Sequence, residues 1–351
     1  MQSTLRQPRV TLGWIVFLLI GVVGFFYVKW FPYYNRAFVA ASQHSIGKSI
    51  LMGTSASAPA ASWQAAIDYA LAYGKAIWQA MVLGLLLGSA VQALIPPQWV
   101  ARALGRADFN SVVKGGLMSL PGMMCTCCAA PVVAGLRARE AAPGAAIAFW
   151  LGNTALNPAT LIFMGFVLGW QWMGLRLALG IVMVFGLGYV VNRMVTPREA
   201  QVSREAVAQL VSADDPGTAF SRWITILGRM TLRLVPEYIV LVLILGAARA
   251  WLFPHIGPDV DNSLLWIIAL SIAGTLFVIP TAGEVPIIQA MLSFGMAAGP
   301  AGALLMTLPL VSVPSLAMLA RSFPQRVLTV VACAVVVCGV VSGLLAVALG
   351  F

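Results

Sequence analysis

The chain has 351 residues, of which 60% are hydrophobic and only 9% are charged, and its formal net charge is +10. A soluble domain carries roughly 25% charged residues, so this composition excludes an ordinary soluble protein and predicts a chain that crosses a membrane several times. The 21 lysines and arginines lie mostly in short gaps between apolar segments, as in membrane-flanking loops. They form no basic stripe with interleaved aromatic residues, which excludes nucleic acid as a partner.

The first apolar segment covers residues 12–30 and follows a basic N-terminus. It resembles a signal peptide, but the bulky and basic sequence YVKWFPYYNR follows it in place of a small-residue cleavage site. We therefore expect an uncleaved signal-anchor span, which together with a small-residue linker makes up residues 1–62.

Six further apolar segments are predicted to span the membrane. A helix needs about 20 apolar residues to cross a hydrocarbon core about 30 Å thick. The segments are residues 77–95, 145–168, 174–191, 239–253, 301–320 and 327–349. A strongly polar stretch, residues 196–219, separates the chain into two halves, residues 63–195 and 220–351.

The two halves resemble each other. LGSAVQALIP (residues 87–96) matches LGAARAWLFP (residues 245–254), and prolines recur in register from there on. The paired prolines are Pro96 and Pro254, Pro121 and Pro280, Pro131 and Pro286, Pro143 and Pro300, and Pro158 and Pro314. General similarity between apolar helices explains matching leucines and alanines but not matching proline spacing, so we predict an internal repeat.

The basic residues predict opposite orientations for the two repeats. Arginines and lysines flank residues 115–136 on both sides, so both ends of this segment are expected in the cytoplasm, as in a re-entrant hairpin. The same rule places residues 196–219 inside and makes residues 263–296 a hairpin that enters from outside. The expected fold is an all-α polytopic membrane protein with about seven full spans plus two re-entrant hairpins in an inverted-topology repeat, the architecture of many secondary transporters.

One segment conflicts with this topology. Residues 29–62 are expected outside, yet they contain Lys29, Arg36 and Lys48 and no acidic residue. A different orientation of the first span would remove the conflict without affecting the repeat.

The first hairpin contains LPGMMCTCCAAP, residues 120–131, where three cysteines lie close together between two prolines. Such a break in a membrane helix is tolerated where it is buried or lines a cavity, and it leaves polar backbone groups free to hold a solute. Thiolates are soft ligands that suit Cu(I), Zn(II) and similar thiophilic centres, and trivalent arsenic belongs with them. We therefore take Cys125, Thr126, Cys127 and Cys128 as candidate binding residues, with the three cysteines as candidate metal ligands. The alternative is that small polarisable side chains pack a tight turn.

The second hairpin contains IPTAGEVP, residues 279–286, with Thr281 and Glu284. A carboxylate in a membrane break is costly and indicates function, so Glu284 is the candidate proton or counter-ion site that couples transport. The alternative is a structural acid that is neutral or paired with a distant arginine. Two later breaks add further candidate binding residues, namely Asn153, Asn157 and Ser312, although such side chains also serve to satisfy kinked backbone.

Several other chemistries are excluded. The sequence contains no G-x-x-x-x-G-K-[ST] phosphate loop, which excludes direct use of ATP through that motif. Its two histidines, His44 and His255, lie in expected external loops and allow neither a histidine metal site nor a Ser-His-Asp triad. Cys333 and Cys338 lie in the last apolar segment and are expected to be packing residues. No resident cofactor and no catalytic residue is predicted.

These breaks give the chain a resemblance to a known family. From residue 65 to the end it resembles the YraQ-type predicted permeases, which include the organoarsenical efflux permease ArsP. The resemblance rests on PGMMCTCCAAPVVAGLRAREAAPGAAIAFWLGNTALNPATLIF and IPTAGEVPIIQAMLSFGMAAGPAGALLMTLPLVSVPSL. Members carry a Cys-x-Cys motif before a proline, which Cys125, Cys127 and Pro131 supply here, whereas Cys128 is an addition. The family implies a permease fold, and its members have been linked to trivalent organoarsenicals, arsenite and soft metals.

Together these features predict a permease of the bacterial inner membrane that moves a soft, thiol-reactive solute by alternating access. Such a solute and the lipid bilayer are its expected partners. Two alternatives remain open. The first is a membrane thiol-disulfide redox enzyme that uses Cys125 and Cys128, and the second is a passive channel.

Overall fold

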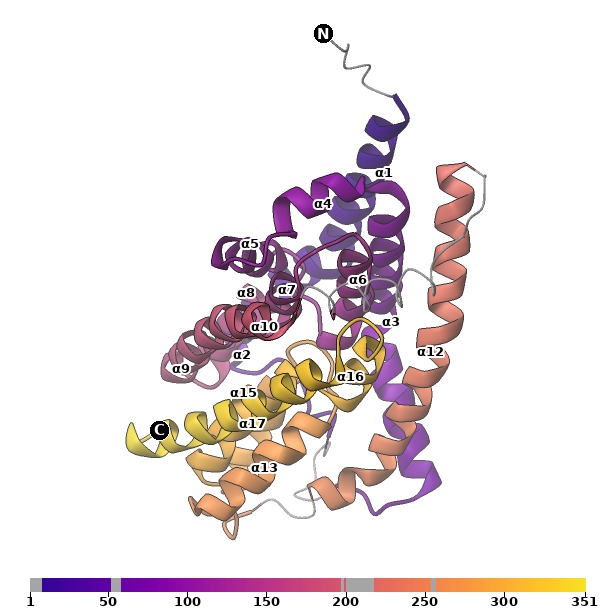
Figure 1. Ribbon diagram of the computed structural model, residues 1–351. Helices are drawn as coiled ribbons and strands as arrows, with labels where there is room; N and C mark the ends of the chain where they lie inside the picture. The colour runs from indigo at the N-terminus through magenta and orange to yellow at the C-terminus, as the bar shows by residue number, and fades with distance from the viewer. Residues whose placement is uncertain (1–7, 52–57, 197–198, 200–217, 254–256) are drawn as a thin grey trace.

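The computed structural model describes residues 8–51, 58–196, 199, 218–253 and 257–351, and every regular element among them is a helix (Figure 1). Seven helical segments of this part are long and apolar enough to cross a membrane. They are Leu12–Gln43, Trp63–Leu94, Pro143–Val167, Trp170–Met194, Ala219–Leu252, Ala298–Leu319 and Gln325–Ala348. The prediction of an all-α polytopic membrane protein is confirmed. Most of the predicted linker at 196–219 lies outside the described residues.

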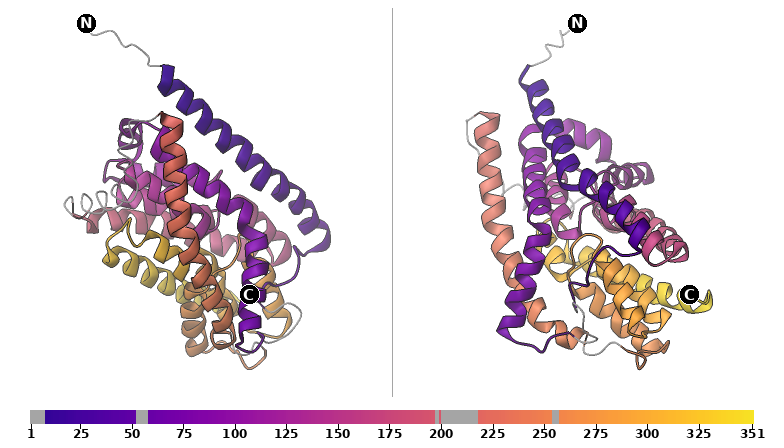
Figure 2. Two further views of the ribbon diagram at one scale, coloured as in Figure 1. Left: turned by 90° about the vertical axis from the view of Figure 1, so that its right-hand side faces the viewer. Right: turned by 180° about the vertical axis from the view of Figure 1, so that it is seen from behind.

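The N-terminal segment forms one long helix along the outside of the molecule (Figure 2). It comprises α1 (Pro8–Phe25), the π-helical turn η1 (Phe26–Trp30) and α2 (Phe31–Gln43). The segment predicted at residues 12–30 is therefore too short, because the helix continues through its bulky aromatic flank. A helix rises 1.5 Å per residue, so the 32 residues of Leu12–Gln43 cover about 48 Å and must tilt in a hydrocarbon core of about 30 Å.

Two long helices pack side by side at one face of the molecule (Figures 1 and 2). They are α3 (Trp63–Leu94) and α12 (Ala219–Leu252), and both begin well before the predicted apolar segments. The Ser62 and Thr218 side chains accept hydrogen bonds from the first turns of α3 and α12, respectively, which allows each helix to start in polar sequence. Two buried hydrogen bonds join the pair: Tyr238 Oη to Tyr73 Oη at 2.6 Å, and Trp223 Nε1 to Ser89 Oγ at 2.9 Å.

The remaining elements follow the same order in each half. After α4 (Pro97–Leu104), the first half has α5 (Phe109–Ser119), α6 (Thr126–Ala138), α7 (Pro143–Ala155), α8 (Pro158–Val167), α9 (Trp170–Ile181), η2 (Val182–Leu187) and α10 (Gly188–Met194). The second half has α13 (Leu264–Leu276), α14 (Glu284–Ser293), α15 (Ala298–Leu310), α16 (Val313–Leu319) and α17 (Gln325–Ala348). The first residues of α5 and α13, of α7 and α15, of α8 and α16, and of α9 and α17 each lie 155 positions apart, as 109 and 264 illustrate.

The turns that lead into α7 and α15 also correspond. Glu140 has φ 68° and Gly295 has φ 92°, again 155 positions apart. Each is followed by a backbone bond that closes the preceding helix, from Ala141 N to Leu136 O at 3.0 Å and from Met296 N to Met291 O at 3.1 Å. A left-handed residue with this bond is the usual way to end a helix sharply. The helices before α7 and α15 therefore end in the same way.

The helix breaks lie at 120–125, between α5 and α6, and at 277–283, between α13 and α14. The four helices around them have 10–13 residues, about 15–20 Å of length, which is too short to cross a bilayer alone. Pro131 was expected to interrupt its helix, but α6 continues through it. Its backbone has no N–H to donate to the Cys127 carbonyl, so the proline removes one helical bond just after the cysteines.

Glycines of α3 allow α6 to approach closely. A Cβ atom on Gly84 would overlap the Cys128 carbonyl, and one on Gly88 would overlap the Pro131 carbonyl. This Gly-x-x-x-Gly spacing is common where membrane helices pack backbone to backbone. The α3 helix therefore determines where the backbone of the cysteine segment lies.

Substitution of Gly84 is expected to displace that segment. Gly84→Ala forces α3 and α6 apart and should lower stability by about 1–3 kcal/mol, the usual range for overpacking. Transport should fall with it, because the cysteines move. Gly74→Ala on the same helix is the matched control, since nothing lies within 4 Å of its added Cβ. The test compares the melting temperature and the transport flux of Gly84→Ala with those of Gly74→Ala. If the two variants do not differ, the close approach of α3 and α6 is unimportant.

Candidate functional site

The three cysteines lie at the start of α6 and are buried. Cys125 is the N-cap residue and Cys128 lies one turn later, so their side chains share a face of the helix, and their Sγ atoms are 2.8 Å apart. Cys127 points elsewhere, with its Sγ 3.7 Å from Ser312 Oγ at the start of α16. The cluster therefore divides into a thiol pair and a single thiol that contacts the second half of the chain.

Side chains from other helices fix the break that carries the thiols. Asn153 Oδ1 accepts a hydrogen bond from the Met124 N–H at 3.4 Å, and Trp150 Nε1 donates to the Thr126 carbonyl at 3.0 Å. Trp30 Nε1 of the N-terminal helix donates to the Pro121 carbonyl at 2.8 Å. The Met124 N–H and the Pro121 carbonyl lie in the break and gain hydrogen-bond partners in this way, as a membrane interior requires. They give Asn153 a supporting role beside the thiols.

The second break places Glu284 at the first position of α14, where it is 1% exposed. Its Oε1 lies 2.8 Å from Nη1 of Arg176, a residue of α9 that is equally buried. Arg176 also donates to three carbonyl groups, those of Thr154, Ala155 and Leu305. A buried ion pair needs such additional hydrogen bonds to offset the desolvation of both charges. The pair joins the second break to the first half of the chain.

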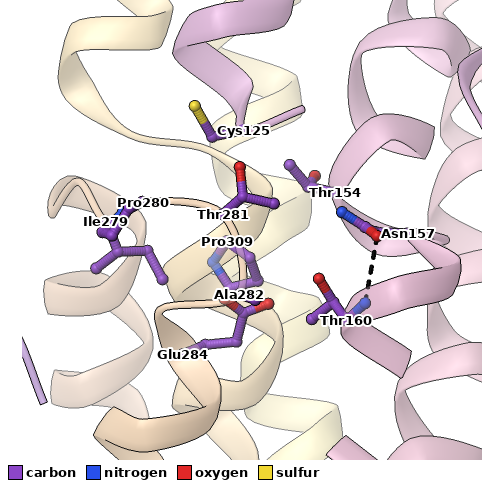
Figure 3. Close-up of a pocket in the computed structure, with 10 residues that line it drawn as sticks. All are labelled: Cys125, Thr154, Asn157, Thr160, Ile279, Pro280, Thr281, Ala282, Glu284 and Pro309. Carbon is purple, nitrogen blue, oxygen red and sulfur yellow. Dashed lines mark hydrogen bonds between the residues drawn. The ribbon is translucent and has the colours of Figure 1, made fainter. Parts of the chain in front are cut away.

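A small, partly open cavity lies between the two breaks. Figure 3 shows Cys125 on one side, the second break along another, and the threonine and asparagine side chains of the α7–α8 segment opposite. The lining residues are Cys125, Thr154, Asn157, Thr160, Ile279, Pro280, Thr281, Ala282, Glu284 and Pro309. Both halves of the chain therefore form this cavity.

Two polar atoms of lining residues are buried and have no hydrogen-bond partner, namely Glu284 Oε2 and Asn157 Nδ2. The Asn157 Oδ1 atom caps α8, because it accepts from the Ala159 and Thr160 N–H groups at 3.1 and 3.2 Å, and Figure 3 draws the second of these bonds. A buried polar atom without a partner costs about 1–3 kcal/mol. One free acceptor and one free donor among the residues that line the cavity are what a polar ligand would satisfy.

The predicted binding residues thus occupy two positions. Four of them, Cys125, Asn157, Thr281 and Glu284, line the cavity. The others are not among its lining residues, namely Thr126, Cys127, Cys128, Asn153 and Ser312. In the described part of the chain no three His, Cys, Asp or Glu side chains are arranged to hold one metal ion. Chelation by Cys125, Cys127 and Cys128 together therefore remains a prediction, while the close pair is Cys125 and Cys128.

Two charged residues near the cavity were missed as site residues. Arg176 lies within the predicted apolar span at 174–191, and a charge in such a position is a functional signal by default. Lys29 was recognised only as a topological conflict, yet it is 4% exposed and its Nζ donates to Thr281 Oγ1 at 3.1 Å. Its position in the first span gave a signal of the same kind.

Comparison with known proteins identifies the family. Residues 62–348 match the ArsP_1 family, described as predicted permease. The UPF0718 protein YraQ of Escherichia coli (strain K12) is 52% identical over 331 residues, which cover 94% of each chain. The chain belongs to this family of predicted permeases. No solved structure matches it.

Membership of the ArsP_1 family agrees with the resemblance found in the sequence. Together with the seven apolar helical segments it establishes a multi-pass membrane permease. It favours a transporter over an enzyme. The match to the family begins at residue 62, so the N-terminal helix lies outside it. Two residues of that helix nevertheless contact the breaks: Trp30 contacts the first and Lys29 the second.

Proposed function

We propose that this permease is a secondary transporter of the bacterial inner membrane that moves a soft, thiol-reactive solute. The observation that carries the proposal is the Cys125–Cys128 pair, whose Sγ atoms are 2.8 Å apart at a helix break, with Cys125 in the wall of a cavity formed by both halves. Two adjacent thiols chelate thiophilic centres. Organoarsenicals, arsenite, soft metal ions and sulfur compounds are the candidate cargoes.

Alternating access is the proposed mechanism, with the cavity as the substrate site between two inverted repeats. In such transporters the site lies where broken helices of the two repeats meet. Contacts between the halves support this arrangement, because α16 packs on α6 and α14 packs on α8. The helices that follow the two breaks, α6 and α14, thus each pack against a helix of the other half. A movement of one half relative to the other would open the cavity first to one side of the membrane and then to the other.

Long-range hydrogen bonds support the inverted topology. Arg137 Nε donates to the Ser322 carbonyl at 3.3 Å and so joins two turns that are both expected in the cytoplasm. His44 Nδ1 lies 2.8 Å from the Phe166 carbonyl, and Gln289 Nε2 donates to the His44 carbonyl at 2.7 Å. His44 and the second hairpin are expected outside, and the predicted span at 145–168, which follows the cytoplasmic end of the first hairpin, is expected to end outside as well. Segments that are predicted on the same side of the membrane are thus hydrogen-bonded to each other, which supports the proposed topology.

Single-cysteine labelling tests the topology directly. In a background in which all five native cysteines are replaced by serine, Glu140→Cys should react with a membrane-impermeant maleimide only after permeabilisation, whereas Ser293→Cys should react in intact cells. Both positions are exposed and lie beside the corresponding turns of the two halves. Labelling of both from the same side would rule out the inverted repeat.

A thiol-disulfide redox enzyme is the second candidate, because the short Cys125–Cys128 distance also suits oxidation to a disulfide. An electron path would need a further redox partner close by. Cys333 is exposed and Cys338 buried on α17, and a five-residue separation places them on different faces of the helix. The remaining cysteines therefore give this alternative little support.

A resistance and uptake screen tests the proposed function. Cells that lack the gene should change in sensitivity or content for at least one of methylarsenite, arsenite, antimonite, copper, silver, zinc or a sulfur oxyanion. The wild-type gene should reverse the change and the Cys125→Ser gene should not. If every compound gives the same result with and without the gene, the soft-solute assignment is wrong.

A further inference from the structure

The N-terminal helix runs along the outside of the molecule, but two adjacent side chains of it reach inward (Figure 2). Only 11% of the most apolar window of this segment is buried, whereas Lys29 is 4% exposed. Lys29 and Trp30 belong to the π-helical turn η1, and such turns occur frequently at functional sites. A lysine within a membrane segment is costly and is found where it faces a functional interior.

This turn is hydrogen-bonded to both helix breaks. Lys29 Nζ donates to Thr281 Oγ1 of the second break at 3.1 Å, and Trp30 Nε1 donates to the Pro121 carbonyl of the first break at 2.8 Å. Thr281 lines the cavity, and so does Cys125, with which the first break ends. A bond from an ammonium group is stronger than one between neutral groups. Two adjacent residues of one helix therefore join the two breaks beside the cavity.

Tyr33, one turn after Lys29, orients the ammonium group. Its Oη accepts a hydrogen bond from Lys29 Nζ at 3.2 Å, and its ring centroid lies 5.1 Å from the same atom. The Tyr33 ring also packs edge to face against Phe163 of α8, with 5.7 Å between the centroids, and α2 as a whole packs on α8. The Lys29 side chain is thus held in place by its own helix and by the first half of the chain.

The end of the N-terminal helix joins the two halves a second time. A helix rises 1.5 Å per residue, so His44, the C-cap residue of α2, lies about 21 Å beyond Trp30. Its Nδ1 lies 2.8 Å from the Phe166 carbonyl of α8, and its carbonyl accepts from Gln289 Nε2 of α14 at 2.7 Å. These two helices belong to different halves, and each begins at residues that line the cavity. The contacts therefore extend from the cavity to the segment expected outside.

We propose that the N-terminal helix, with His44 at its end, is a clamp that holds the cavity closed toward the outside, and that Lys29 and Trp30 are positioning residues for the two breaks. The clamp rests on the proposed alternating access and adds to it a helix that lies outside the family match. A helix bonded to both halves stabilises the arrangement in which its bonds are made. Loss of one bond therefore shifts the population toward states in which the halves have moved apart.

The reactivity of a cavity residue measures this shift. Thr160 lines the cavity and is 1% exposed (Figure 3), so Thr160→Cys, in a chain whose five native cysteines are replaced by serine, reacts when the cavity opens. A membrane-impermeant maleimide applied to intact cells reports opening toward the outside. Lys29→Met should raise the labelling rate about tenfold or more, and Trp30→Phe, which removes a neutral donor, about threefold. Lys29→Arg keeps the charge and the donor and should stay within about twofold of the parent.

Two controls distinguish the clamp from general loosening of the protein. Arg36→Met removes an exposed charge from the same helix and should leave the labelling rate unchanged. Cys338, retained as the single thiol in place of Thr160→Cys, is buried on α17 and is not among the lining residues, so it should stay unreactive in every variant. If it reacts in Lys29→Met, that variant is loosened as a whole, and Trp30→Phe provides the comparison.

The outcomes separate the clamp from the proposed function. An unchanged rate in Lys29→Met and Trp30→Phe would overturn the clamp, and so would an increase that appears only after permeabilisation. If Thr160→Cys reacts from neither side of the membrane in any variant, the cavity does not open, and the proposed alternating access would be overturned instead.

Discussion

Replacement of Cys125 by serine is expected to abolish transport, with uptake falling to the level of cells that lack the gene. Serine keeps the size of the side chain but removes the soft ligand. The thiol belongs to the close pair with Cys128 and faces the cavity, so one change removes both chelation and the contact with solute. Uptake of the cargo found in the screen, normalised to the amount of protein in the membrane, measures the effect.

The other cysteines provide a graded comparison. Cys127→Ser removes a thiol that contacts Ser312 across the two halves, and it too is expected to abolish transport. Cys333 is exposed on α17, so Cys333→Ser should be nearly silent. Expression of all variants should match the wild type, since a buried hydroxyl in place of a thiol costs only about 1–3 kcal/mol. If the Cys125→Ser, Cys127→Ser double variant shows wild-type uptake, the cysteines serve only to pack the turn and do not bind the solute.

The geometry of the cluster follows partly from its sequence. Positions three apart share a helix face and positions two apart do not, so the pairing of Cys125 with Cys128 could have been predicted once the helix was known to begin at Thr126. The start itself could not, because both Pro121 and Pro131 were possible breaks. In the structure only the segment after Pro121 is non-helical, and α3 packs against the helix that runs through Pro131.

The spans were predictable because a bilayer imposes a length on apolar helices. The ends of these helices were not predictable, because a helix continues into polar or aromatic sequence when no residue there terminates it. This happens in α2 and in the first turns of α3 and α12. The contacts that Arg176 and Lys29 make at the site could not be predicted from the sequence either. Sequence gives the depth of Arg176 and Lys29 in their segments, but only packing tells that Arg176 faces Glu284 and that Lys29 faces Thr281.

Glu284→Gln is expected to abolish transport driven by a pH gradient while cargo still binds. Glutamine keeps the shape of the side chain but cannot take up a proton. Glu284 Oε2 is buried without a partner in a residue that lines the cavity, where it is placed to accept a proton or to face a cation. Flux in proteoliposomes under an imposed pH gradient should fall to the level of empty liposomes. Glu237→Gln, an exposed acid on α12, should keep wild-type flux.

The ion pair with Arg176 offers a second explanation for such a loss, because removal of one partner from a buried pair costs about 3–5 kcal/mol. The double variant Arg176→Gln, Glu284→Gln separates the two. It removes both charges of the pair, so neither charge is left buried without its partner. If Glu284 couples transport, the double variant should regain most of the melting temperature lost in Glu284→Gln and still show no pH-driven flux. Recovery of flux together with stability would make the pair a structural bridge between the halves, and the coupling site would have to be another group.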